Sequence, residues 1–186
     1  DGYALYQVVE KWHDGFPSHE LFVVDLIALG PVAHGALWRF LCSMDLVGEV
    51  RCNDVPPDDP LPWLLRNPRA VRTTNRTDGL WIRLLDVAQF FSARLRDVEP
   101  SVTIEVAGDE AAVSGTWELG AGGCRRTDAP VEVALGISEL GSLSLGGHSA
   151  LVLAVAGRIE ERVEGAAARL DEVLRAPHVP HCPTHF

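Results

Sequence analysis

The pattern of apolar and polar residues predicts strands and one helix in the opening part of the chain. Residues 2–10 are rich in aromatic and β-branched side chains, which favour a strand. Residues 20–30 are apolar on both faces and are therefore expected to form a central strand. Residues 48–52 predict a further strand, and the Asp-Gly and Pro of residues 13–18 indicate a turn. The order is strand, strand, helix, strand.

The helix is expected to begin at Pro31, because proline is favoured in the first turn of a helix. Its apolar residues recur every three or four positions and form one amphipathic stripe. They are Ala33, Leu37, Phe40, Leu41 and Met44. Residues 53–62 contain four prolines and three aspartates, which end regular structure. A short helix over residues 62–66 is expected to follow.

A second region is predicted to begin near the Asp78-Gly79 turn. Residues 80–85 predict a strand. A helix should follow with Asp86 as its N-cap, because Gln89 stands three residues later as in a capping box. The apolar face of this helix is expected to comprise Val87, Phe90, Phe91 and Leu95.

The rest of the chain predicts short alternating strands in an antiparallel sheet, and then helices, which together indicate an α+β layered fold. The strands are expected over residues 101–107, 111–118 and 130–136, and the helices over residues 137–147, 148–159 and 162–175. The apolar run at 150–156 favours a buried core helix. The last helix should bury one face, made of Val163, Ala167, Leu170 and Leu174.

Composition narrows the classes of function. The chain has 186 residues, 47% of them hydrophobic, which is enough for one good core or two small ones. Its net charge of −10 disfavours nucleic-acid binding, because phosphates must be met by Lys and Arg. An acidic surface would concentrate cationic substrates such as polyamines, aminoglycosides or basic peptides, or would only keep the protein in solution. No apolar run reaches the roughly 20 residues that span a bilayer.

The chain ends with HVPHCPTHF, which places three histidines and a cysteine close together. His181 and Cys182 are adjacent and flanked by prolines, so both cannot easily turn toward one ion. No metal site is therefore predicted. The four cysteines are widely separated, which favours free thiols in a reducing cytoplasm over a disulfide framework. The glycines at 119–123 and 145–147 lack the strand-to-helix context of a phosphate-binding loop.

Several stretches taken in order resemble one family, from the first residue to the last. They are DGYALY (1–6), ALWRFL (36–41), DDPLPWLL (58–65), RTTNRTDGLWIRL (72–84) and LGSLSLGG (140–147), followed by the aromatic tail. Together they resemble the C-terminal half of the Eis-type (enhanced intracellular survival) GNAT N-acetyltransferases. The resemblance implies the later part of a central GNAT-like domain, β-β-α-β, over residues 1–75. It implies a sterol-carrier-protein-like domain, an antiparallel sheet covered by helices, over residues 78–186.

The same resemblance implies a site. In this family the terminal carboxylate of the chain is the general base, which here is that of Phe186. The acceptor pocket would draw on Asp54, Asn75 and Thr77, with His185 beside the chain end. Relatives commonly carry larger apolar residues at these places, so this pocket is expected to be more polar. Ser144 also replaces a tyrosine that is frequent in the glycine-rich motif.

The expected activity is acetyl transfer from acetyl-CoA to primary amines of cationic substrates, such as aminoglycoside-like compounds or lysines. Acetyl-CoA would be bound by an N-terminal domain that this sequence does not include, so the chain alone is expected to be inactive. The family resemblance also implies a hexamer. A different hypothesis is a sterol-carrier-like module that binds lipids or other apolar ligands without catalysis, with the apolar helix at 149–159 lining a tunnel.

Overall fold

The computed structural model describes residues 1–95 and 98–183. The chain forms two compact units. The first contains residues 1–79 together with Cys182 and Pro183, and the second contains residues 80–181. The domain limits expected from the sequence, 1–75 and 78–186, stay a prediction. The α+β class is confirmed, since both units combine a sheet with helices.

The first unit is built on a three-stranded sheet in the order β1-β4-β5. β1 (Gly2–Val9) is antiparallel to β4 (His19–Ala28), and β5 (Val47–Cys52) is parallel to β4. β4 is thus the central strand, as its apolar residues on both faces predicted. Between β1 and β4 the strands β2 (Trp12–His13) and β3 (Phe16–Pro17) form a small hairpin. Asp14 and Gly15 make its turn with positive φ angles, as Asp-Gly hairpin turns require.

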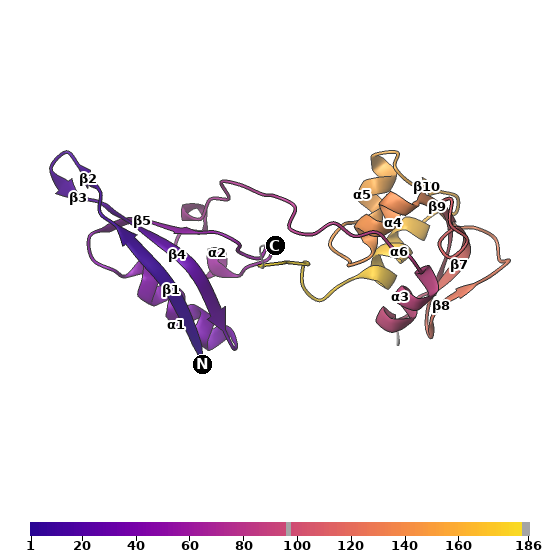
Figure 1. Cartoon of the computed structure of the whole chain (residues 1–186), viewed down its shortest axis with the longest axis horizontal. Helices are drawn as coiled ribbons and strands as arrows, with labels where there is room; N and C mark the ends of the chain where they lie inside the picture. Colours follow the sequence, from indigo (N-terminus) through magenta and orange to yellow (C-terminus); the bar gives the residue numbers. More distant parts are fainter. Residues whose placement is uncertain (96–97, 184–186) are drawn as a thin grey trace. The chain divides into compact units, whose positions relative to one another are not determined.

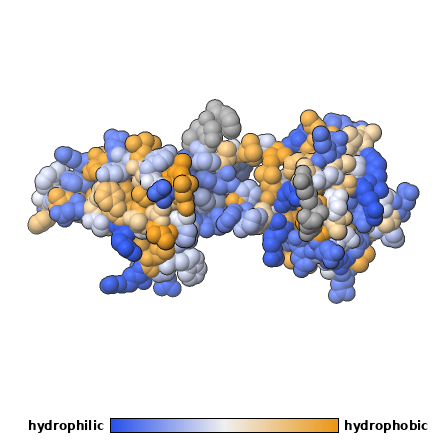
Figure 2. All heavy atoms as spheres, turned by 90° about the horizontal axis from the view of Figure 1, so that it is seen from below, coloured by the Kyte–Doolittle hydropathy of each residue, from blue (hydrophilic) through white to orange (hydrophobic). Residues whose placement is uncertain are grey.

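One helix, α1 (Pro31–Cys42), packs on a face of this sheet (Figure 1). The small core between them contains Leu21 and Val23 of β4 and Trp38 and Leu41 of α1. The predicted stripe of α1 was wrong at Phe40, which is 50% exposed. Its ring meets Tyr6 of β1 edge-on instead of entering the core. Hydrophobic residues therefore reach the surface of this unit (Figure 2).

After β5 the chain is mostly irregular, as the prolines predicted. It forms only the short helix α2 (Leu61–Leu64) and the 3-10 turn η1 (Pro68–Ala70). The predicted strand at residues 80–85 was wrong, because this segment has no strand partner. Its Ile82 carbonyl lies against Gly141, where an added Cβ would be 2.8 Å from the oxygen. The segment therefore packs on a helix rather than on the edge of a sheet.

The second unit contains a five-stranded sheet in the order β10-β9-β6-β7-β8. Its strands are β6 (Val102–Ala107), β7 (Gly115–Gly120), β8 (Gly123–Arg126), β9 (Val133–Gly136) and β10 (Glu160–Glu161). The sheet is mixed rather than fully antiparallel, since β6 and β9 run parallel. The chain reaches β9 by a long excursion through β7 and β8, which allows the parallel pairing.

In the described part of this unit, four helices accompany the sheet. They are α3 (Val87–Arg94), α4 (Ile137–Leu143), α5 (Ala150–Val155) and α6 (Ala166–Leu174). The predicted cap of α3 is present, because the Asp86 carboxylate accepts a hydrogen bond from the Gln89 backbone amide at 2.8 Å. The core between helices and sheet includes Phe91, Ile104, Leu119 and Leu170, all fully buried.

Two expectations for these helices were wrong. The apolar run at 150–156 is not a buried core helix, since Val152 of α5 is 65% exposed and Val155 is 92% exposed. Only Ala150 of α5 is fully buried, because the helix packs along one side of α6. Val163 precedes α6 and is exposed, whereas Ala167, Leu170 and Leu174 are buried as predicted.

Candidate functional site

The described residues predicted for the site all lie in the first unit. Asp54 follows β5 directly and adopts a left-handed backbone conformation with φ of 55°. Asn75 and Thr77 lie on the irregular segment after η1, and all three side chains are exposed. His185 and Phe186 lie outside the described residues. The roles predicted for these five residues stay predictions.

The C-terminal tail returns to the segment that carries Asn75 and Thr77. Cys182 lies beside Gly79, where an added Cβ would be 3.5 Å from the Cys182 carbonyl oxygen. Gly79 is two residues beyond Thr77 and Cys182 is four residues before the chain end. Segments 103 residues apart are thus brought together in one unit.

A group of carboxylates at the end of β5 was only partly predicted. The pKa of the Cys52 thiol is raised to about 11, first by burial and then by the negative charges of Asp59, Asp54 and Asp25. These three residues, called the acidic group below, come from β4 and from the loop after β5. Asp25 was missed because it approaches Cys52 only when β4 and β5 pair, and Asp59 because its approach depends on the path of the loop after β5. The acidic group creates a negative potential, which favours a cation.

Asp59 is held in place by its neighbours. One of its oxygens accepts a hydrogen bond from the Leu61 amide at 2.7 Å, and the other lies 3.0 Å from His34 Nε2. Trp38 Nε1 lies 3.2 Å from the same His34 nitrogen, so that nitrogen serves either Trp38 as an acceptor or Asp59 as a donor. These contacts fix the Asp59 carboxylate between α1 and α2. Its position is therefore set by the fold and not by a flexible loop.

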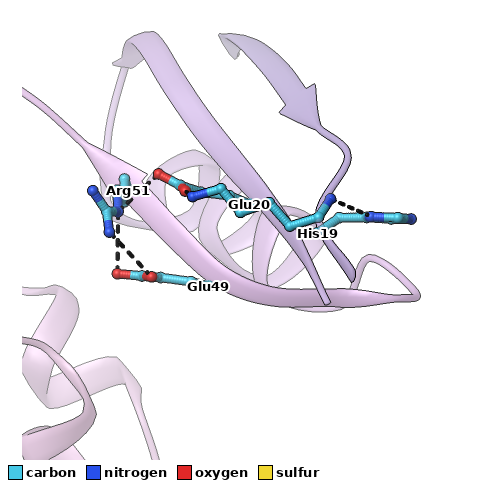
Figure 3. A network of polar contacts seen from close by, with 5 residues as sticks. His19, Glu20, Glu49 and Arg51 are labelled. Carbon is cyan, nitrogen blue, oxygen red and sulfur yellow. Dashed lines mark hydrogen bonds and ion pairs between the residues drawn. The ribbon is translucent and has the colours of Figure 1, made fainter. Parts of the chain in front are cut away.

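The basic side chains on β5 and beside β4 are already paired with carboxylates (Figure 3). Arg51 Nε lies 2.8 Å from Glu20 and 3.2 Å from Glu49. Lys11 also pairs with Glu20, and its backbone amide donates to His19 at 3.2 Å. The hydrogen bond from Lys11 holds the pKa of Glu20 below its usual value, with burial opposing and the Arg51 charge adding to the effect. Arg51 and Lys11 are thus engaged by their own carboxylates.

The negative potential can be measured at Cys52 itself. Replacing Asp59 by Asn is expected to lower the pKa of this thiol, because one of the negative charges that disfavour the thiolate is removed. The pH dependence of iodoacetamide alkylation, followed by mass spectrometry of the Cys52 peptide, gives this pKa. Asp45→Asn, a change at an exposed carboxylate outside the acidic group, should leave it unchanged. An unaltered alkylation profile for Asp59→Asn would contradict the electrostatic account.

The site offers no evident metal centre. Within the two described stretches of the chain, 1–95 and 98–183, His, Cys, Asp and Glu form no group of three or more that could hold an ion. The described helices also include none that is long and apolar enough to cross a membrane.

Family models match both parts of the chain. An acetyltransferase (GNAT) domain matches residues 1–94, and a sterol carrier protein domain matches residues 87–183. An uncharacterized N-acetyltransferase of Streptomyces griseus is 40% identical over 191 residues, covering 100% of this chain and 46% of the relative. N-acetyltransferase Eis of Mycobacterium tuberculosis is 36% identical, over 97% of this chain and 44% of the relative.

A solved structure agrees with these relatives. Eis1 from Mycobacterium abscessus superposes with a TM-score of 0.87 at 29% identity, covering 100% of this chain and 48% of that protein. The chain belongs to the Eis-like GNAT acetyltransferases. A GCN5-related N-acetyltransferase from Kribbella flavida, at 24% identity and a TM-score of 0.63, shares the fold of this Eis-like chain. The Eis-like chain spans about half the length of the relatives it matches.

Proposed function

We propose that this Eis-like chain is the C-terminal part of an acetyl-CoA-dependent N-acetyltransferase that acts on primary amines of cationic substrates. The α-carboxylate of Phe186 serves as the general base. The observation that carries the proposal is the return of the tail to Gly79, in the same unit as the acidic group. A tail in this place can bring a base to an amine that the carboxylates attract.

The proposed reaction needs a base because the acceptor is protonated at neutral pH. An alkylamine has a pKa near 10.4 by analogy with lysine, and only its neutral form attacks the thioester. The carboxylate would take one proton from the ammonium group, and the neutral nitrogen would then bond to the acetyl carbon. As the bond from that carbon to the sulfur breaks, the second proton lost by the nitrogen would pass to the sulfur, so that coenzyme A leaves as a thiol and the carboxyl group releases its proton to water. A free α-carboxyl has a pKa of about 3.3–3.7, so burial would have to raise it for efficient catalysis.

The residues of this chain do not fit acetyl-CoA at the place where its fold would suggest. The N-terminus of α1 faces a depression of about 450 Å³ lined by apolar residues, two glycines and Asp1. A pyrophosphate group needs backbone amides and positive charge. Pro31 removes one amide, and Asp1 is negative. We therefore place acetyl-CoA on a domain outside this sequence.

The acceptor half of the proposal is tested with neomycin, a polycationic aminoglycoside, by NMR titration of this chain. Amides near Asp54 and between residues 73 and 79 are expected to shift. Asp54→Asn should weaken binding about fivefold, since one charge contact at the surface is worth about 1 kcal/mol. Asp128→Asn, which changes an exposed carboxylate of the second unit, is the matched control. Shifts confined to the second unit, or none at millimolar neomycin, would refute the acceptor assignment.

The exposed apolar face of α5 favours a second candidate, a lipid-binding module of the sterol-carrier type. The depression found on this unit is about 470 Å³, but Glu105, Arg158, Glu160 and Arg162 contribute to its lining. Charged walls disfavour an acyl chain. Binding of a fluorescent fatty acid, competed by unlabelled fatty acid, would support the lipid module; its absence favours the acetyltransferase.

Two further parts belong to the proposal. Assembly as a hexamer follows from the family resemblance, and a cytoplasmic location is favoured by the widely separated cysteines. The mass in solution of the complete gene product tests the first of these.

A further inference from the structure

The tail passes directly over the two glycines that end the LGSLSLGG motif. A Cβ on Gly146 would overlap the carbonyl oxygen of Leu174 and would lie 2.8 Å from the Ala176 nitrogen. A Cβ on Gly147 would lie 2.8 Å from Cδ of Pro180 and 3.1 Å from its Cγ. Contacts this short leave no room for a side chain at either position. The close passage of the tail therefore explains why the motif ends in two glycines.

A third residue holds the start of this crossing. Arg94, the last residue of α3, donates a hydrogen bond from Nη2 to the carbonyl of Leu174. Leu174 is the last residue of α6, where carbonyls lack partners within the helix and a positive charge is favourable. The guanidinium also lies 2.8 Å from the Cβ that Gly146 would carry. Arg94, Gly146 and Leu174 thus meet at one point.

The Arg94 side chain is partly buried. Burial lowers the pKa of Arg94, because its charged guanidinium group loses water at this position. Arg94 Nη1 is buried and has no hydrogen-bond partner among the described residues. Burying a charged guanidinium group costs free energy, because the group loses water. The hydrogen bond from Arg94 Nη2 to the end of α6 offsets part of that cost, which indicates that the contact helps to fix the path of the chain.

We propose that Arg94, Gly146 and Gly147 are positioning residues that fix the path of the C-terminal tail from Leu174 to Pro180. Cys182, which lies beside Gly79, follows Pro180 by two positions, with only His181 between them. Two residue steps span at most about 7 Å, so the chain path up to Pro180 limits the positions that Cys182 can reach. The catalytic role of the Phe186 carboxylate rests on the proposed function. The positioning of the tail by these three residues does not depend on that function.

Gly147→Ala gives the sharpest test, because its backbone has no positive φ and the three atoms nearest the added methyl all belong to Pro180. Amide hydrogen exchange of the 176–182 peptide in the intact chain is expected to become about tenfold faster. Exchange in β6 should stay unchanged. Combining the change with Pro180→Ala should give less than the sum of the two single effects, because the clash partner is gone. Gly35→Ala, which adds a methyl into open space in α1, is the matched control.

The role of Arg94 is tested by comparing two substitutions, one that removes the hydrogen-bond donor and one that keeps it. Arg94→Leu should speed exchange of the same peptide, and Arg94→Lys should restore part of the protection, since it keeps a donor for the Leu174 carbonyl. Asp86→Ala weakens the same helix at its other end without contacting the tail, and therefore controls for a loss of α3 stability. Unchanged exchange of the tail peptide in both Gly147→Ala and Arg94→Leu would overturn the proposal. An equal rise in tail and β6 exchange would also overturn it, because it would indicate general destabilisation.

These results are separable from the proposed activity. Faster tail exchange without loss of acetyl transfer by the complete gene product would support the positioning of the tail and reject the chain-end base. Protected exchange in every variant would reject the positioning residues, whatever the activity.

Discussion

Adding one glycine after Phe186 is expected to lower kcat of the complete gene product by about 10²–10⁴-fold, the range that a general base contributes. The extra residue moves the carboxylate by up to about 3.6 Å, beyond hydrogen-bond reach of the amine. Release of coenzyme A, followed with a thiol reagent in the presence of neomycin, measures the rate. The KM for acetyl-CoA should not change, because we propose that its site lies outside this chain.

Phe186→Ala is the matched variant, since it removes the ring and keeps the carboxylate. Its rate should fall less than that of the extended protein. Full activity with the added glycine, or an equal loss for both variants, would contradict the chain-end base.

The second large effect is on stability. Gly146→Ala is expected to destabilise the second unit by about 2–5 kcal/mol, because it combines an overpacked contact with a left-handed backbone. Gly146 has φ of +75°, and its added methyl would meet the backbone of Leu174 and Ala176. Backbone atoms at the end of a buried helix cannot move aside as a flexible side chain can. Urea unfolding measures the change.

Gly157→Ala separates the two causes. Gly157 has φ of +69°, close to that of Gly146, but an added Cβ there meets nothing within 4 Å. It should show only the backbone cost, about 1–2 kcal/mol. If both variants lost the same free energy of unfolding, the close contact between the tail and Gly146 would be contradicted.

The sequence predicted those elements whose signal is local. β4 was recognised as central because it is apolar on both faces, and the start of α3 because Asp86 and Gln89 form a capping pattern. Pro31 marked the beginning of α1. In each case the deciding residues lie within one element. The α+β class and a boundary near Asp78-Gly79 were predicted from the residue pattern, and the family resemblance supplied the identity of the expected domains.

The errors concern partners that lie far apart in the chain. Residues 80–85 have the composition of a strand, yet their place is set by contact with Gly141. β8 was missed because Gly123 and Cys124 look like a glycine-rich turn until β7 pairs with them. The apolar run of α5 predicted burial, but the position of α6 leaves Val155 exposed. Burial of an apolar helix depends on what the rest of the fold places over it.

In the candidate site, too, residues with a local sequence signal were predicted and residues brought in from distant segments were missed. Asp54 follows β5 and was proposed from sequence, whereas Asp25 and Asp59 join it only through strand pairing and the loop after β5. The approach of Cys182 to Gly79 also had no local signal. The passage of the tail over Gly146 and Gly147 could have been suspected from these glycines, since glycine allows another chain segment to approach closely.

The central claim is that the polypeptide's own terminal carboxylate removes the proton from the acceptor amine. The most direct measurement replaces this group by a carboxamide, through semisynthesis of the complete gene product, and compares kcat near neutral pH. The change keeps every side chain and the length of the tail, and removes only the basic oxygen. The account predicts a loss of at least about 100-fold with an unaltered KM for acetyl-CoA. A carboxamide enzyme that turns over at the normal rate would contradict it.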